Sequence, residues 1–154
     1  MKTKKSLLLL SVLAMVSLFS SFVATSGGEG FEIYIDNKLV IQQFNQEMKN
    51  LNNIQLNASN VKSELKVKFY HCGMPGNNRS LSLKDPQQRL LKQWQFSNEE
   101  GKNFAIAIPL KEVLALQQKA GNPTLYLYYS SKESGNGRLL AGLVNPGKVA
   151  ATAR

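Results

Sequence analysis

The segment SELKVKFYHC, Ser63 to Cys72, alternates apolar and polar side chains more clearly than any other part of the chain. Its apolar positions include Leu65, Val67 and Phe69, and lysines separate them. Because successive side chains of a strand point to opposite faces, this alternation predicts a strand with one face in a core and the other in water. Parallel strands are usually buried on both faces and apolar throughout, so the segment indicates an antiparallel sheet.

Other segments share this period of two, and turn-forming residues separate them. We predict strands in FEIYI (31–35), LVIQQF (39–44), NIQLNA (53–58), SLSLKD (80–85), RLLKQWQF (89–96), NFAIAI (103–108), TLYLYYSS (124–131) and RLLAGLV (138–144). Tight turns are predicted at 36–38 and at 85–88, where Pro86 suits the second position of a turn. In the segment 89–96 we expect Leu90, Trp94 and Phe96 to share one face.

The period changes once, in PLKEVLALQQKAG (109–121). Leu110, Val113, Leu114 and Gln117 recur there at helical spacing, between an initial proline and a final glycine. We therefore expect one short helix near 110–119.

About nine short strands with one helix predict an all-β fold, since such strands need a second sheet to cover their apolar faces. The expected architecture is an antiparallel β-sandwich, immunoglobulin-like or jelly-roll. A closed barrel is the alternative.

The N-terminus has the order of a secretory signal peptide. Lys2, Lys4 and Lys5 precede the uncharged run 6–24, and small residues follow it. We place cleavage near Ser26–Gly27, because the peptidase accepts small side chains there. The alternative is an uncleaved anchor, since the run approaches the length that spans a bilayer.

This prediction divides the chain into a signal peptide (1–26), a single β-sandwich domain (27–145) and a flexible C-terminal tail (146–154). The mature protein is then periplasmic or secreted and has no membrane span after cleavage. Its basic residues are scattered, although the formal net charge of the chain is +9. Scattered charge does not favour nucleic-acid binding, and for an exported protein it suggests weak attraction to anionic envelope or glycans.

The segment HCGM (71–74) holds the only histidine and the only cysteine of the chain. Strand alternation puts His71 and Cys72 on opposite faces, which disfavours a nucleophile–base pair. The usual zinc and blue-copper sites need more histidines or cysteines. One metal hypothesis survives, a soft copper or thiol-redox site formed by His71, Cys72 and Met74. The alternative is a structural strand end followed by a turn.

A single cysteine allows no intramolecular disulfide, so Cys72 is buried, reactive, or the link of a homodimer. We find no catalytic residues and expect no resident cofactor, copper excepted. The chain is therefore predicted not to be an enzyme.

Tyr126 and Tyr128 share one predicted strand face, opposite Leu125 and Leu127. Exposed tyrosines on a flat sheet can stack against sugar rings or a peptide. The alternative is that each ring covers the edge of the core with its hydroxyl in water.

Three stretches, GFEIYIDNKLVIQQF (30–44), HCGMPGNNRSLSLKD (71–85) and NGRLLAGL (136–143), resemble a group of small exported β-rich proteins of Gram-negative bacteria. The resemblance implies a periplasmic or secreted β-rich domain, and it carries no activity, cofactor or site residue.

We therefore expect an exported, non-catalytic β-sandwich that binds a ligand or takes part in envelope or extracellular assembly, with a protein or glycan partner. The alternatives are the copper or thiol-redox protein and a glycan-binding module that uses the surface tyrosines.

Overall fold

The structure, a computed structural model, describes residues 28–98, 100–101, 104–121 and 124–146. The predicted signal peptide and almost all of the predicted tail lie outside these residues. Within the described ranges, no helix combines the length and the apolar character that crossing a membrane requires.

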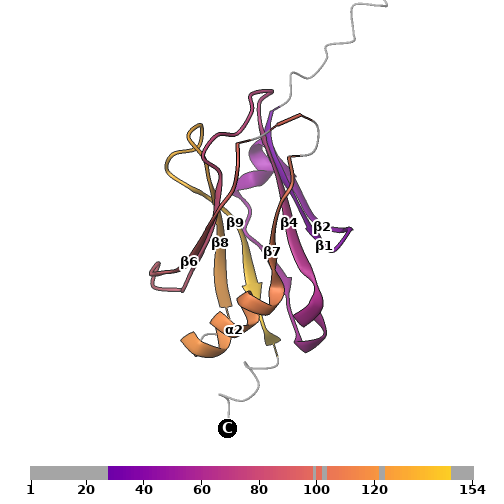
Figure 1. Cartoon of the computed structure of the whole chain (residues 1–154), viewed down its shortest axis with the longest axis vertical. Coiled ribbons are helices and arrows are strands. Elements are labelled where there is room, and N and C mark those ends of the chain that lie inside the picture. Colours follow the sequence, from indigo (N-terminus) through magenta and orange to yellow (C-terminus); the bar gives the residue numbers. More distant parts are fainter. Residues whose placement is uncertain (1–27, 99, 102–103, 122–123, 147–154) are drawn as a thin grey trace, which may run out of the picture.

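Two sheets pack face to face (Figure 1). Sheet A has the strand order β2-β1-β4-β7, and sheet B has the order β3-β9-β8-β5-β6. The strands are β1 (Glu29–Ile35), β2 (Lys38–Phe44), β3 (Asn52–Gln55), β4 (Glu64–His71), β5 (Ser80–Lys84), β6 (Leu90–Gln95), β7 (Ile106–Pro109), β8 (Thr124–Ser130) and β9 (Arg138–Val144). Short 3-10 helices follow two of them, η2 (Asn45–Lys49) and η3 (Ala58–Lys62).

The all-β sandwich is confirmed, and its core lies between the two sheets. Strand β4 is buried at every second residue, and the buried side chains include Leu65 and Val67. Leu83, Leu125 and Leu127 face them from sheet B and are fully buried. Each such side chain contributes roughly 1.5–3 kcal/mol through the hydrophobic effect.

One strand pair differs from the predicted antiparallel arrangement, since β3 runs parallel to β9. The chain leaves sheet A at the end of β2 and crosses to sheet B through η2. It enters β3 from the end of the sandwich at which β9 also begins, so the two strands point the same way (Figure 1).

The expectation that Leu90, Trp94 and Phe96 share a face is wrong for Leu90. Trp94 pairs with the buried Leu81 and therefore faces inward, whereas Leu90 pairs with Lys84 and is 56% exposed. A register shift at the start of β6 reverses the side of the strand on which Leu90 lies.

The predicted helix is confirmed as α2 (Leu110–Ala120), which lies at one end of the sandwich (Figure 1). Leu110 and Val113 are fully buried. Gln117 Nε2 donates to the Leu143 carbonyl at 2.9 Å and ties the helix to β9. Gly121 ends the helix with a φ of 64°, a conformation that glycine adopts without cost.

Candidate ligand-binding site

Tyr126 and Tyr128 lie on the outer face of sheet B, near its centre. Burial alternates along β8, so Leu125 and Leu127 enter the core while the two tyrosines are half-buried on the other side. The prediction that these tyrosines share a face is confirmed. The third tyrosine of the strand, Tyr129, is buried.

Small residues lie beside both rings. Tyr126 pairs with Gly142, and Gly142 pairs with Asn53 on β3. A Cβ atom at Gly142 would lie 2.2 Å from Asn53 Oδ1, so glycine lets the amide of Asn53 lie close to Tyr126. Tyr128 pairs with Ser82, which is similarly small. Each tyrosine therefore has one small cross-strand neighbour, whereas its neighbour on the other side is large, Lys84 beside Tyr126 and Leu139 beside Tyr128.

The side chains around the tyrosines are mostly neutral and polar. None of the five strands of sheet B contains an aspartate or a glutamate. Amides and hydroxyls both donate and accept hydrogen bonds, as recognition of a polyhydroxylated ligand requires. The outward-facing residues with such groups include Asn53, Gln55, Ser82, Gln93, Gln95, Tyr126, Tyr128 and Ser130. Among the described residues, the side chains of Asn53, Gln93 and Gln95 have no hydrogen-bond partner.

Tyr128 is held in place from one side. Its hydroxyl donates to Gln88 Oε1 at 2.8 Å, and the ammonium of Lys84 lies 4.4 Å from its ring centroid. The ring is therefore preordered, which lowers the entropic cost of stacking against a ligand.

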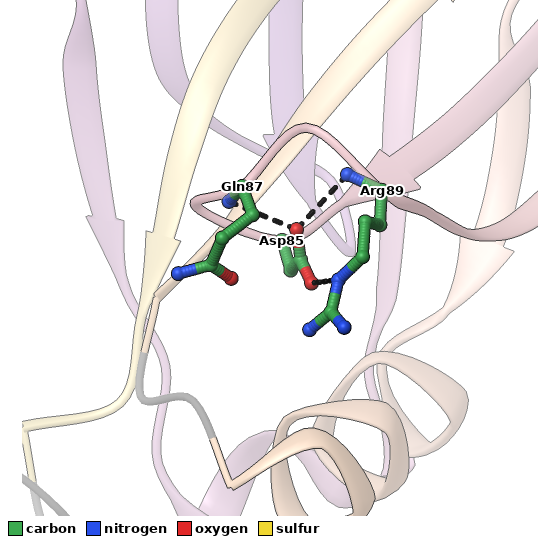
Figure 2. Close-up of polar contacts among 3 residues, drawn as sticks. All are labelled: Asp85, Gln87 and Arg89. Atoms are coloured by element: carbon green, nitrogen blue, oxygen red, sulfur yellow. Dashed lines mark hydrogen bonds and ion pairs between the residues drawn. The ribbon is translucent and has the colours of Figure 1, made fainter.

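Gln88 belongs to the β5–β6 turn, which Asp85 organises. Figure 2 shows the Asp85 carboxylate accepting from Gln87 N at 2.9 Å, from Arg89 N at 3.0 Å and from Arg89 Nε at 2.6 Å. Burial alone would raise the pKa of Asp85, but these hydrogen bonds and the Arg89 charge outweigh it, so the pKa lies below its ordinary value. A charged, fully bonded Asp85 thus fixes the turn that presents Gln88.

A hollow of about 320 Å³ opens beside Tyr128. Its charged lining residues are both basic, Lys49 at the end of η2 and Arg138 at the start of β9. Leu51 and Leu139 add apolar surface to the lining. This volume lies near the lower end of the range for ligand pockets, ~300–1,000 Å³.

The HCGM segment forms a tight turn at the end of β4. Met74 N donates to the His71 carbonyl at 3.1 Å, and the central residues Cys72 and Gly73 have φ values of 53° and 83°. Positive φ at both central positions is typical of a type I′ turn. Cys72 and Met74 are exposed at this turn.

His71 points the other way, into the molecule, and is 5% exposed. Its Nε2 lies 2.8 Å from the Tyr129 hydroxyl, and its ring packs 4.8 Å from Phe69. Among the described residues, no group of three His, Cys, Asp or Glu side chains is arranged to hold a metal ion. The copper or thiol-redox hypothesis stays a prediction, and the separation of His71 from Cys72 does not favour it.

The outer face of sheet A has a different character. Glu32 accepts hydrogen bonds from the hydroxyls of Tyr34 at 2.6 Å and Tyr70 at 3.0 Å. Burial, and then the bond to Glu32, raise the pKa of Tyr70 to about 12. Lys68 lies over the Tyr34 ring at 5.4 Å. These groups satisfy one another, whereas the amides of sheet B are available to a ligand.

The strand period in the sequence predicts the shared face of the two tyrosines, but it does not predict all of the basic residues near them. The alternation of SLSLK puts Lys84 on the outer face, so the position of this lysine can be predicted from the sequence. Lys49 and Arg138 are 89 positions apart in the numbering and meet only because η2 crosses between the sheets.

Comparison with known proteins adds no assignment: no protein-family model matches the chain, and no curated protein matches it.

Proposed function

We propose that this chain is an exported, non-catalytic β-sandwich that binds glycans on the outer face of sheet B. One observation carries the proposal: Tyr126 and Tyr128 project from the same face of β8, two residues apart, on a sheet face with amides and hydroxyls whose strands contain no acidic residue.

The chemistry of this face suits a saccharide. The C–H faces of a sugar ring are apolar and stack on aromatic rings, while its hydroxyls need partners that both donate and accept. Tyr126 and Tyr128 supply the rings, and the free amides of Asn53 and Gln93 supply the partners. Because all four residues lie on strands, the sheet fixes the spacing of their backbone positions before the ligand arrives.

One observation from the sequence supports export, and one from the structure supports the absence of catalysis. The leader has the order of a signal peptide. The strongest nucleophile–base pair, His71 and Cys72, separates into a buried and an exposed side chain.

A glycan array tests the proposal directly. Protein purified from cells that express the full chain should bind a defined subset of glycans. Tyr126→Ala and Tyr128→Ala should each weaken that binding by about tenfold or more, ~1.4 kcal/mol, because a stacking ring is lost. Tyr34→Ala is the matched control, since it removes a half-buried tyrosine from the outer face of sheet A.

A flat array profile, or binding that Tyr126→Ala leaves unchanged, would contradict glycan binding at this face. Release of shorter sugars from a bound glycan would contradict the non-catalytic part of the proposal.

A further inference from the structure

We infer that the glycan is anionic and that one of its acidic groups occupies the basic hollow beside Tyr128. This inference rests on the proposed function and narrows its ligand class.

Basic side chains approach Tyr128 from two directions. The Lys84 ammonium lies 4.4 Å from the ring centroid, and the hollow on the neighbouring side is lined by Lys49 and Arg138. The strands of this sheet contribute no carboxylate.

Part of this charge is uncompensated. Arg138 Nη2 pairs with Glu29, which lies on β1 of the other sheet. Lys49 and Lys84 have no carboxylate partner among the described residues. Two cations thus face a ligand that contacts Tyr128. An anionic group in the hollow is attracted directly by Lys49, and partial burial there strengthens that attraction, while Lys84 adds positive charge at the Tyr128 ring.

The volume and lining of the hollow favour one sugar residue that carries an acidic group over an isolated small ion. Its volume of about 320 Å³ includes the apolar surfaces of Leu51 and Leu139. A sugar ring can place its C–H face against these leucines while its acidic substituent points to Lys49. Tyr126 lies two residues away along β8, so a neighbouring sugar would lie about 7 Å further along the strand.

Two matched pairs of polymers test the inference and separate carboxylate from sulfate as the acidic group. Polygalacturonate is compared with its methyl ester, and dextran sulfate with dextran. The protein should bind at least one charged polymer about tenfold or more tightly than its uncharged counterpart.

Charge-matched variants distinguish this site from the general basicity of the protein. Lys49→Gln with Lys84→Gln should weaken binding of the charged polymer by about tenfold. Lys38→Gln with Lys111→Gln removes the same charge from exposed positions outside sheet B and should change binding by about twofold or less.

Equal losses in the two double variants would overturn the inference, because binding would then follow net charge alone. Equal affinity for charged and uncharged polymers would also overturn it, yet would leave glycan binding intact. No binding to any polymer, together with a flat array, would remove the proposed function and the inference with it. Thermal melting of each variant checks that its fold is retained.

Discussion

His71 illustrates at the scale of one residue how a candidate ligand takes a packing role. Its imidazole contacts the Tyr129 hydroxyl, and Tyr129 in turn stacks on Phe69 with ring centroids 4.3 Å apart. The backbone of Gly76 packs closely against His71 and Tyr129. A Cβ atom added at Gly76 would come within 2.9 Å of His71 Nε2 and 3.0 Å of the Tyr129 hydroxyl.

We therefore predict that Gly76→Ala lowers the free energy of unfolding by about 1–3 kcal/mol, because the added methyl group must displace buried rings. Gly135→Ala is the control, since nothing lies within 4 Å of its added Cβ. Urea denaturation compares the two variants with the parent. If both retained the parental stability, the close contact at Gly76 would not exist.

At the scale of an element, the Glu133 carboxylate is one of the groups that anchor the loop 131–137. Glu133 Oε2 accepts from Asn77 N at 2.9 Å and Glu133 Oε1 from Asn77 Nδ2 at 2.7 Å. These bonds, the backbone bond from Asn77 first, outweigh the opposing effect of burial and lower the pKa of Glu133 to about 2. The loop leads directly into Arg138, so its anchoring also positions the basic hollow.

We predict that Glu133→Gln lowers the free energy of unfolding at neutral pH by about 1 kcal/mol, the typical contribution of such bonds near the surface. The pKa of Glu133 is lowered on folding, so its contribution is full above the ordinary value of 4.5 and is lost as pH falls from 4.5 towards about 2. The difference between variant and parent should therefore shrink over this window. Denaturant unfolding at a series of pH values measures it.

Glu100→Gln provides the control, because Glu100 is exposed and has no described partner. A Glu133→Gln difference that stayed constant down to about pH 2 would show that its carboxylate is not the stabilising group.

At the scale of the molecule, the two sheets share one core. Residues of both sheets and of α2 belong to a single cluster of buried apolar side chains, among them Leu65, Leu127 and Val113. Cys72 is exposed and is the only cysteine of the chain, so no internal disulfide adds to this core.

We predict one cooperative unfolding transition, with the same midpoint in far-UV and near-UV circular dichroism. A reducing agent should leave that midpoint unchanged, because a chain with one cysteine has no internal disulfide that contributes to its stability. Two separate transitions would contradict a shared core. Non-reducing electrophoresis shows whether the Cys72-linked homodimer forms.

Local pattern was sufficient for much of the fold. The alternation around Leu65 and Val67, the helical spacing after Pro109 and the turn at Pro86 all specify structure through neighbours in sequence, so they could be predicted from it. The shared face of Tyr126 and Tyr128 follows in the same way from the strand period.

Sequence by itself thus determined the all-β class, the helix and the face of the two tyrosines, because each depends on the direction of side chains along one segment. Only the tertiary structure decided that β3 lies parallel to β9, that Leu90 turns outward, and that Lys49 and Arg138 meet beside Tyr128. Those features depend on how the chain crosses between the sheets and on register shifts between strands. The crossing and the register shifts are set by the packing of the whole core, and neither produces a periodic pattern in the sequence from which it could be predicted.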